Sequence, residues 1–215
     1  MIELIIDEKS YGNNNIFHDA KINIEEKQMV AIKGMSGSGK STLLSMIGLL
    51  EDFEGKYYFK NEIIDKHNKE SIRRNYFSYV FQKPFLIPYL NVKENILMPL
   101  KNLKENIDLA KYNEILGILN ISELENRYPD TLSGGEAQRV SIARAVLSNR
   151  KIILCDEPTG SLDPINTKIV MDSLKKIQNT LNVSIIIVTH SSEFDSYFDA
   201  IFYIENKKVL QNVSA

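Results

Sequence analysis

The stretch Gly34-Met35-Ser36-Gly37-Ser38-Gly39-Lys40-Ser41-Thr42 matches the pattern G-x-x-x-x-G-K-[ST] of a phosphate-binding loop. Successive backbone N–H groups can wrap a polyphosphate where glycines keep side chains away, and the following helix points its positive end at the anion. We expect Lys40 to reach the outer phosphates and the Ser41 hydroxyl to ligate Mg²⁺. The alternative is a Gly/Ser-rich turn that merely joins a strand to a helix. The motif predicts a site for ATP and Mg²⁺ formed by Gly34, Ser36, Gly37, Ser38, Gly39, Lys40, Ser41 and Thr42.

Strand and helix patterns on both sides place this loop in an α/β fold. A short apolar strand is expected at residues 29–33, before the loop, and an amphipathic helix at residues 40–50, after it. Because strands alternate with helices, we expect a mainly parallel sheet that is covered on both faces. The other expected elements are strands at 2–6, 16–24, 77–81, 151–155 and 183–188, two short strands within 55–64, a turn at 11–15, a helix at 164–181 and a hairpin at 200–210.

Residues 84–150 differ in character from the rest of the chain. Strand patterns disappear there, helical periods replace them, and Pro84, Pro88 and Pro99 punctuate the beginning. We interpret the stretch as a helical subdomain inserted into an α/β core. The core would then consist of residues 1–83 and 151–215, and residues 1–215 would form a single domain.

Composition and charge fit an ordinary globular domain. The 215 residues are 43% hydrophobic and 25% charged, and the net charge of −2 gives no reason to expect a nucleic-acid partner. The lone cysteine, Cys155, excludes an internal disulfide framework and reads as a small buried hydrophobe. The N-terminus does not resemble a signal peptide, and no apolar run is long enough to cross a bilayer. Any membrane role would therefore depend on a partner.

Two carboxylates follow a second buried strand. Ile152-Ile153-Leu154-Cys155 is apolar, and Asp156-Glu157 comes directly after it. The carboxyl ends of parallel strands meet at the ligand crevice of an α/β sheet, so Asp156 is placed to hold Mg²⁺ and Glu157 to polarise an attacking water. In isolation the same pattern is more often a solvated strand end before a turn. The phosphate loop in the same chain favours the catalytic interpretation.

The segment Leu132-Ser133-Gly134-Gly135-Glu136 leads into a helix. Ser133 and Glu136 form an S-x-x-E capping box, which is the purely structural interpretation. A capping box does not need two glycines, and Gly134-Gly135 exposes backbone N–H groups at a helix N-terminus, where an anion can bind. One phosphate loop and two phosphate-binding surfaces suggest a sandwich, in which the second surface grips nucleotide on another subunit.

Taken together, these motifs resemble the ATP-binding-cassette (ABC) ATPases over essentially the whole chain, and residues 132–136 are similar to that family's signature motif. The resemblance implies a P-loop NTPase core with an antiparallel β part at its N-terminus. The roles it implies are adenine stacking for Tyr11, sensing of Mg²⁺ and water for Gln82, a dimer-interface loop containing Asp163, and a γ-phosphate contact for His190. A turn-flanking core tyrosine and a structural strand-end histidine are the alternatives for Tyr11 and His190.

The resemblance also implies a mechanism in which two copies form a homodimer around two Mg-ATP. Each site would join the loop of one chain to Ser133-Gly134-Gly135 of the other, with Glu157 as general base and His190 steadying the γ-phosphate. ATP would close the dimer, and hydrolysis would open it. One departure is Lys27, where relatives usually carry a glycine in a tight turn, so the type of this turn stays open.

Finer features resemble the branch of the family that serves lipoprotein release, macrolide efflux and antimicrobial-peptide export or immunity. Residues 89–100 and Ser161 carry this likeness, and a composition rich in Ile, Asn and Lys would suit a bacteriocin-export ATPase. We therefore expect an ATPase that drives export through a separate transmembrane permease at the inner face of the cell membrane. The expected docking residues are Phe85, Leu86, Ile87 and Tyr89, with internal packing as the alternative.

Two rival functions remain to be separated from this one. The first is an ATP-driven mechanical switch that acts on a membrane protein without transport, as in cell-division relatives. The second is a chromosome-maintenance or repair ATPase, which shares the signature motif. That class places long coiled coils between the phosphate loop and the signature, and no heptad run lies there in this chain. We therefore expect no nucleic-acid partner.

Overall fold

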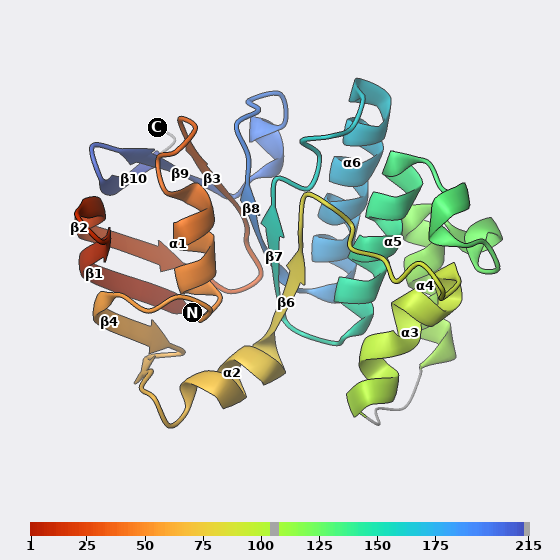
Figure 1. Ribbon diagram of the computed structural model, residues 1–215, viewed down its shortest axis with the longest axis horizontal. Helices are drawn as coiled ribbons and strands as arrows, with labels where there is room; N and C mark the ends of the chain where they lie inside the picture. Colours follow the sequence, from red (N-terminus) through yellow and green to blue (C-terminus); the bar gives the residue numbers. More distant parts are fainter. Residues whose placement is uncertain (104–107, 213–215) are drawn as a thin grey trace.

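A mainly parallel sheet forms the centre of the computed structural model, which describes residues 1–103 and 108–212 (Figure 1). Its strands lie in the order β10-β9-β3-β8-β7-β6, and every neighbouring pair is parallel except β9 and β10. Their bounds are β3 Met29–Gly34, β6 Phe77–Val80, β7 Ile152–Asp156, β8 Ser184–Val188, β9 Ala200–Glu205 and β10 Lys208–Asn212. The predicted α/β fold with a mainly parallel sheet is confirmed.

A second, antiparallel sheet has the order β2-β1-β4-β5. Its strands are β1 Ile2–Tyr11, β2 Asn14–Ile24, β4 Glu54–Phe59 and β5 Glu62–Ile63. The predicted antiparallel part is confirmed, and so is a turn within residues 11–15, although it is shorter and occupies residues 12–13. The prediction that β1 ends near residue 6 is wrong. The second half of β1 is polar and lacks the apolar alternation that identifies a strand, and backbone pairing with β2 extends it to Tyr11.

Helices occupy the connections between strands. They are α1 Lys40–Ile47, α2 Lys69–Tyr76, α3 Val92–Leu103, α4 Leu109–Leu119, α5 Gly134–Leu147 and α6 Pro164–Leu181. The sequence did not predict α2, because only Ile72 and Tyr76 of this mostly polar helix pack against the core, and both are only partly buried. Helix α1 ends at Ile47 instead of residue 50, because Gly48 caps it. Nowhere in the described part of the chain is a helix both long and apolar enough to span a bilayer.

The parallel sheet separates two hydrophobic cores. On β7, Ile153 and Cys155 join the core formed with α3, α4, α5 and α6. Ile152 and Leu154 join the core formed with α1 and the antiparallel sheet. Because side chains alternate along a strand, a strand buried on both faces reads as a continuous apolar run, which is how β7 and β8 were predicted. Cys155 is fully buried, and this burial raises the pKa of its thiol.

Lys27 occupies the turn between β2 and β3 in a left-handed backbone conformation, with φ of 62°. Its N–H donates to Ser184 Oγ at 2.8 Å, and its carbonyl accepts from Gln178 Nε2 at 2.7 Å. These hydrogen bonds hold the backbone of Lys27 in a conformation that favours glycine. The turn geometry is therefore that of a glycine-bearing turn, although a lysine stands in it.

Replacing Lys27 by Gly is expected to raise the free energy of unfolding by about 0.5–1 kcal/mol, because a side chain in the left-handed region is strained. Urea unfolding followed by circular dichroism measures this change. Glu26→Gly, one residue earlier and outside the left-handed region, is the matched control and is expected to lower stability. A loss of stability in Lys27→Gly as well would contradict the assigned strain.

Candidate nucleotide-binding site

The phosphate loop joins β3 to α1, as its pattern requires. Gly37 and Gly39 have φ of 76° and 99°, in the region that side chains rarely adopt. A Cβ on Gly39 would lie 2.6 Å from Ile16 Cγ2 and 2.9 Å from the Phe17 ring, so β2 packs directly against the loop. Close packing requires glycine at position 39, and the positive φ favours glycine at position 37, so side chains stay away from the anion-binding backbone.

Lys40 lies inside the curve of this loop. Its Nζ donates to the carbonyls of Gly34 at 3.0 Å and Met35 at 2.9 Å, and the residue is only 8% exposed. Nearby, the buried Ser38 hydroxyl has no hydrogen-bond partner among the described residues. Among the described residues, the hydrogen bonds of this ammonium go to neutral carbonyls. The ammonium and the unpaired hydroxyl both suit phosphate oxygens, so the residues present fit a polyphosphate.

Ser41 and Asp156 place two oxygen ligands side by side. The Ser41 hydroxyl, at the start of α1, donates to Asp156 Oδ1 at 3.1 Å, and Asp156 ends β7. Burial raises the pKa of Asp156, whereas the hydrogen bond from Ser41 acts in the opposite direction. Oxygen donors of this kind suit Mg²⁺, which takes few protein ligands and shares phosphate oxygens with its substrate. Thr42 follows in the first turn of α1.

Glu157 and His190 face each other across the ends of β7 and β8. Glu157 Oε2 lies 3.2 Å from His190 Nδ1, and the histidine side chain is 68% exposed against 25% for the glutamate. Glu157 has a left-handed φ of 45°, which its N–H bond to Val188 O at 3.0 Å supports. A non-glycine residue in this region is strained, and such strain often accompanies a functional position.

Gln82 approaches the same place from the end of β6. Its Nε2 donates to Ser161 Oγ at 3.4 Å. A Cβ added to Gly160 would lie 3.0 Å from Gln82 Nε2 and 3.1 Å from Glu157 Oε2. No role of Gly160 was predicted from the sequence, although a glycine in the turn Thr159-Gly160-Ser161 indicates that a side chain is not tolerated there. Its missing side chain leaves the space in which Gln82 and Glu157 converge.

A cavity of about 720 Å³ lies beside the loop, within the size range of small-molecule sites. Its lining combines loop residues 34–38 with His190 and with residues 203–206 of the β9–β10 hairpin. The phosphate loop and His190 therefore line the same cavity.

Tyr11 and Asp163 stand at the ends of two further elements, β1 and α6. Tyr11 ends β1 and is 48% exposed, so its ring is accessible to a ligand. Asp163 caps α6, and its carboxylate accepts from the Asn166 N–H at 3.0 Å. The Asp163-Pro164 helix start is confirmed.

The Ser133-Gly134-Gly135 segment is not part of this crevice. Ser133 caps α5 in the predicted capping box with Glu136. In Figure 1 the beginning of α5 lies in the right half of the molecule, whereas α1 lies in the left half, with β7 and β8 between them. The structure thus brings together the loop, Asp156, Glu157, Gln82 and His190, and leaves the signature segment apart.

The two glycines of this segment have different surroundings. A Cβ on Gly135 would lie 2.3 Å from Asn166 Oδ1, so this glycine has a packing reason within the chain. A Cβ on Gly134 would meet only Leu162 Cδ2 at 3.9 Å. Packing therefore explains Gly135, and Gly134 is the one whose role the isolated chain does not explain.

Comparison with known proteins agrees with this geometry. The family described as "ABC transporter" matches residues 17–160. The lipoprotein-releasing system ATP-binding protein LolD of Leptospira interrogans is 39% identical over 193 residues, covering 87% of this chain and 81% of LolD. The macrolide export ATP-binding/permease protein MacB 2 of Aeromonas hydrophila is 36% identical over 92% of this chain and 31% of its own length. A dimeric post-hydrolysis structure of the ATP-binding cassette MJ0796, bound to ADP and Pi, aligns with a TM-score of 0.83 and 32% identity over 99% of this chain and 98% of that one.

Proposed function

The chain belongs to the ABC transporter family as an ATP-hydrolysing subunit, and we propose that it powers export of a peptide, lipoprotein or drug-like substrate through a separate membrane permease. The observation that carries the catalytic part is the convergence of Lys40, Ser41 and Asp156 with Glu157 and His190 at the carboxyl ends of β3, β7 and β8. Ligands of open α/β sheets bind at this edge.

In the proposed reaction, Lys40 leaves its loop carbonyls for the outer phosphates, and the glycine-rich loop surrounds them with N–H groups. Ser41, Asp156 and Gln82 would hold Mg²⁺, which neutralises phosphate charge when bound. Glu157 takes a proton from the attacking water, and its contact with His190 keeps both side chains directed at the same point. Tyr11 stacks on adenine.

A second copy completes each site in this proposal. The N–H groups at the start of α5 lie away from the loop of their own chain, so they can reach a nucleotide only on a partner. Gly134 leaves the approach open, and Asp163 lies in the loop that would cross the interface. The similarity to a dimeric cassette structure supports a homodimer closed by ATP.

We assign permease docking to the loop after Gln82. Phe85 and Tyr89 are exposed, while Leu86 packs against the core. Arg144 donates to the carbonyls of Pro84 at 2.7 Å and Phe85 at 2.9 Å, so the exposed rings stand on a fixed backbone. Exposed aromatic groups on a rigid support are typical of interaction sites.

Buried Asn95 strengthens this support from the other side. Its side chain accepts from the Ile87 N–H at 2.7 Å and donates to Leu90 O at 2.8 Å. We take residues 84–150 as the subdomain that carries the docking loop, and residues 1–83 and 151–215 as the core that holds the nucleotide. The permease would keep the chain at the cytoplasmic face of the membrane.

Phe85→Ser is expected to lower recovery of the permease with the chain at least tenfold, because an aromatic side chain that becomes buried in an interface dominates such contacts. Affinity purification from detergent-solubilised membranes measures this. Leu109→Ser removes an equally exposed apolar side chain on α4 and is expected to leave recovery unchanged. Equal recovery with both variants would assign the docking site elsewhere.

Transport itself is tested in vesicles that contain the co-purified permease and are loaded with peptides, lipoprotein or macrolide. Export predicts movement of one class that depends on ATP and stops when Glu157 is replaced by Gln. ATP hydrolysis with no movement of any class would favour the mechanical switch. A bacteriocin-like peptide is the substrate class we place first, on the composition of the chain.

A further inference from the structure

Lys9 is a buried lysine next to the exposed ring of Tyr11. The two residues lie two positions apart near the end of β1, where a bulge between Lys9 and Ser10 interrupts the pairing with β2. The Lys9 ammonium lies 4.6 Å from the centre of the Tyr11 ring, within range of a cation–π contact. Its side chain is only 9% exposed, although lysines are seldom buried unless they are paired.

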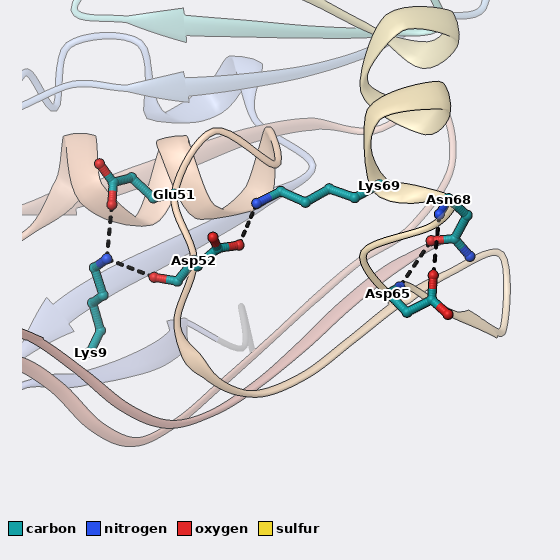
Figure 2. A network of polar contacts seen from close by, with 6 residues as sticks. All are labelled: Lys9, Glu51, Asp52, Asp65, Asn68 and Lys69. Carbon is teal, nitrogen blue, oxygen red and sulfur yellow. Dashed lines mark hydrogen bonds and ion pairs between the residues drawn. The ribbon is translucent and has the colours of Figure 1, made fainter.

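Glu51 and Asp52, which follow α1, hold this lysine in place (Figure 2). Lys9 Nζ donates to Glu51 Oε2 at 2.8 Å and to the Asp52 carbonyl at 2.6 Å. The hydrogen bond from Lys9 lowers the pKa of Glu51, against the opposing effect of burial. Lys9 therefore connects the Glu51 carboxylate to the Tyr11 ring.

We propose that Lys9 and Glu51 are positioning residues that fix the Tyr11 ring, with one face on the ammonium and the other free for the purine base. This inference rests on the proposed role of Tyr11 in base stacking. Ordering an exposed aromatic side chain on binding costs conformational entropy, and a ring that is ordered beforehand avoids that cost. The pair thereby acts on the affinity for the base and leaves the phosphate contacts of the loop alone.

The segment that bears Glu51 follows the helix that begins at Lys40. The same side-chain cluster thus connects the base-stacking strand to the end of the helix that starts at the phosphates. The Asp52 carboxylate also accepts a hydrogen bond from the Lys69 ammonium of α2, on the side away from Lys9 (Figure 2). Lys69 therefore belongs to the same network but makes none of the contacts near Tyr11 described above, which makes it a matched control.

The test compares binding of Mg-ATP with binding of inorganic tripolyphosphate, which has no base, by isothermal titration calorimetry. Lys9→Met is expected to raise the Kd for ATP about 3- to 10-fold and to leave the Kd for tripolyphosphate unchanged. Lys9→Arg, which keeps the cation and the ion pair, is expected to restore ATP affinity to within about twofold. In a Tyr11→Ala background, Lys9→Met is expected to add no further loss, because both act through the same ring.

Lys69→Met is expected to change neither Kd. Equal weakening of ATP and tripolyphosphate by Lys9→Met, or the same ATP loss in Lys69→Met, would show a general structural role and overturn the proposal. Unchanged ATP binding in Lys9→Met would overturn it as well. If Tyr11→Ala alone binds ATP at the parent affinity, the stacking role of Tyr11 fails, which is an outcome separate from failure at Lys9.

Discussion

Glu157→Gln is expected to bind ATP with parent affinity and to hydrolyse it at least about 100-fold more slowly, because an amide cannot accept the proton of the attacking water. The substitution keeps the size of the side chain and its place beside His190. With hydrolysis blocked, ATP should hold the two copies together. Phosphate release measures turnover, and size-exclusion chromatography in Mg-ATP measures the dimer.

Glu123→Gln is the control, since Glu123 is an exposed carboxylate in a short 3₁₀ turn and belongs to none of the contacts of the site. It is expected to match the parent chain in both measurements. Turnover of Glu157→Gln at the parent rate would mean that another group is the base. If Glu157→Gln hydrolyses ATP slowly but stays monomeric in Mg-ATP, the assignment of Glu157 as the base would stand and the ATP-closed dimer would be contradicted.

Mixing two inactive variants is expected to restore activity when their lesions lie in different halves of a shared site. Lys40→Met removes the charge that reaches the phosphates, and Gly134→Asp places a carboxylate at the start of α5, where a side chain has room. Each variant alone should lose nearly all turnover. Their mixture should recover about a quarter of parent activity, because half of the dimers are mixed and each holds one intact site of two.

The matched control mixes Lys40→Met with Glu157→Gln. Both residues belong to one crevice of the same chain, so neither site of a mixed dimer is intact and the mixture should stay inactive. Phosphate release at equal total protein measures both mixtures. Activity in the control mixture, or none in the first, would rule out a site built from the loop of one chain and the α5 segment of the other.

The sequence predicted the sheet and the loop because their signals are local. Buried parallel strands give apolar runs, and the phosphate loop is one contiguous motif from Gly34 to Thr42. Helix α2 was not predicted because it is mostly polar and its apolar residues are only partly buried, and β1 was predicted too short because its second half is polar.

Contacts between distant segments could not be predicted from one chain. Nothing in the sequence connects Lys9 with Glu51, or Gly135 with Asn166, because only the folded chain brings these residues together. For the same reason the packing need of Gly135 was missed, and both glycines of the signature were ascribed to anion binding. The roles of the site residues themselves stay predictions until the variants are measured.

Asn166 offers a physical connection between the two nucleotide sites of the proposed dimer. Its side chain contacts the start of α5 at Gly135, accepts from Arg139 at 3.2 Å and donates to Asp163 at 2.6 Å. The α5 segment would grip the nucleotide of one site, while the short stretch from Asp163 back to Glu157 belongs to the other. Asn166 is thus the single side chain between the α5 segment, which binds one ATP, and the segment that ends at the general base Glu157 of the other site. The two hydrolysis events would therefore be coupled instead of independent.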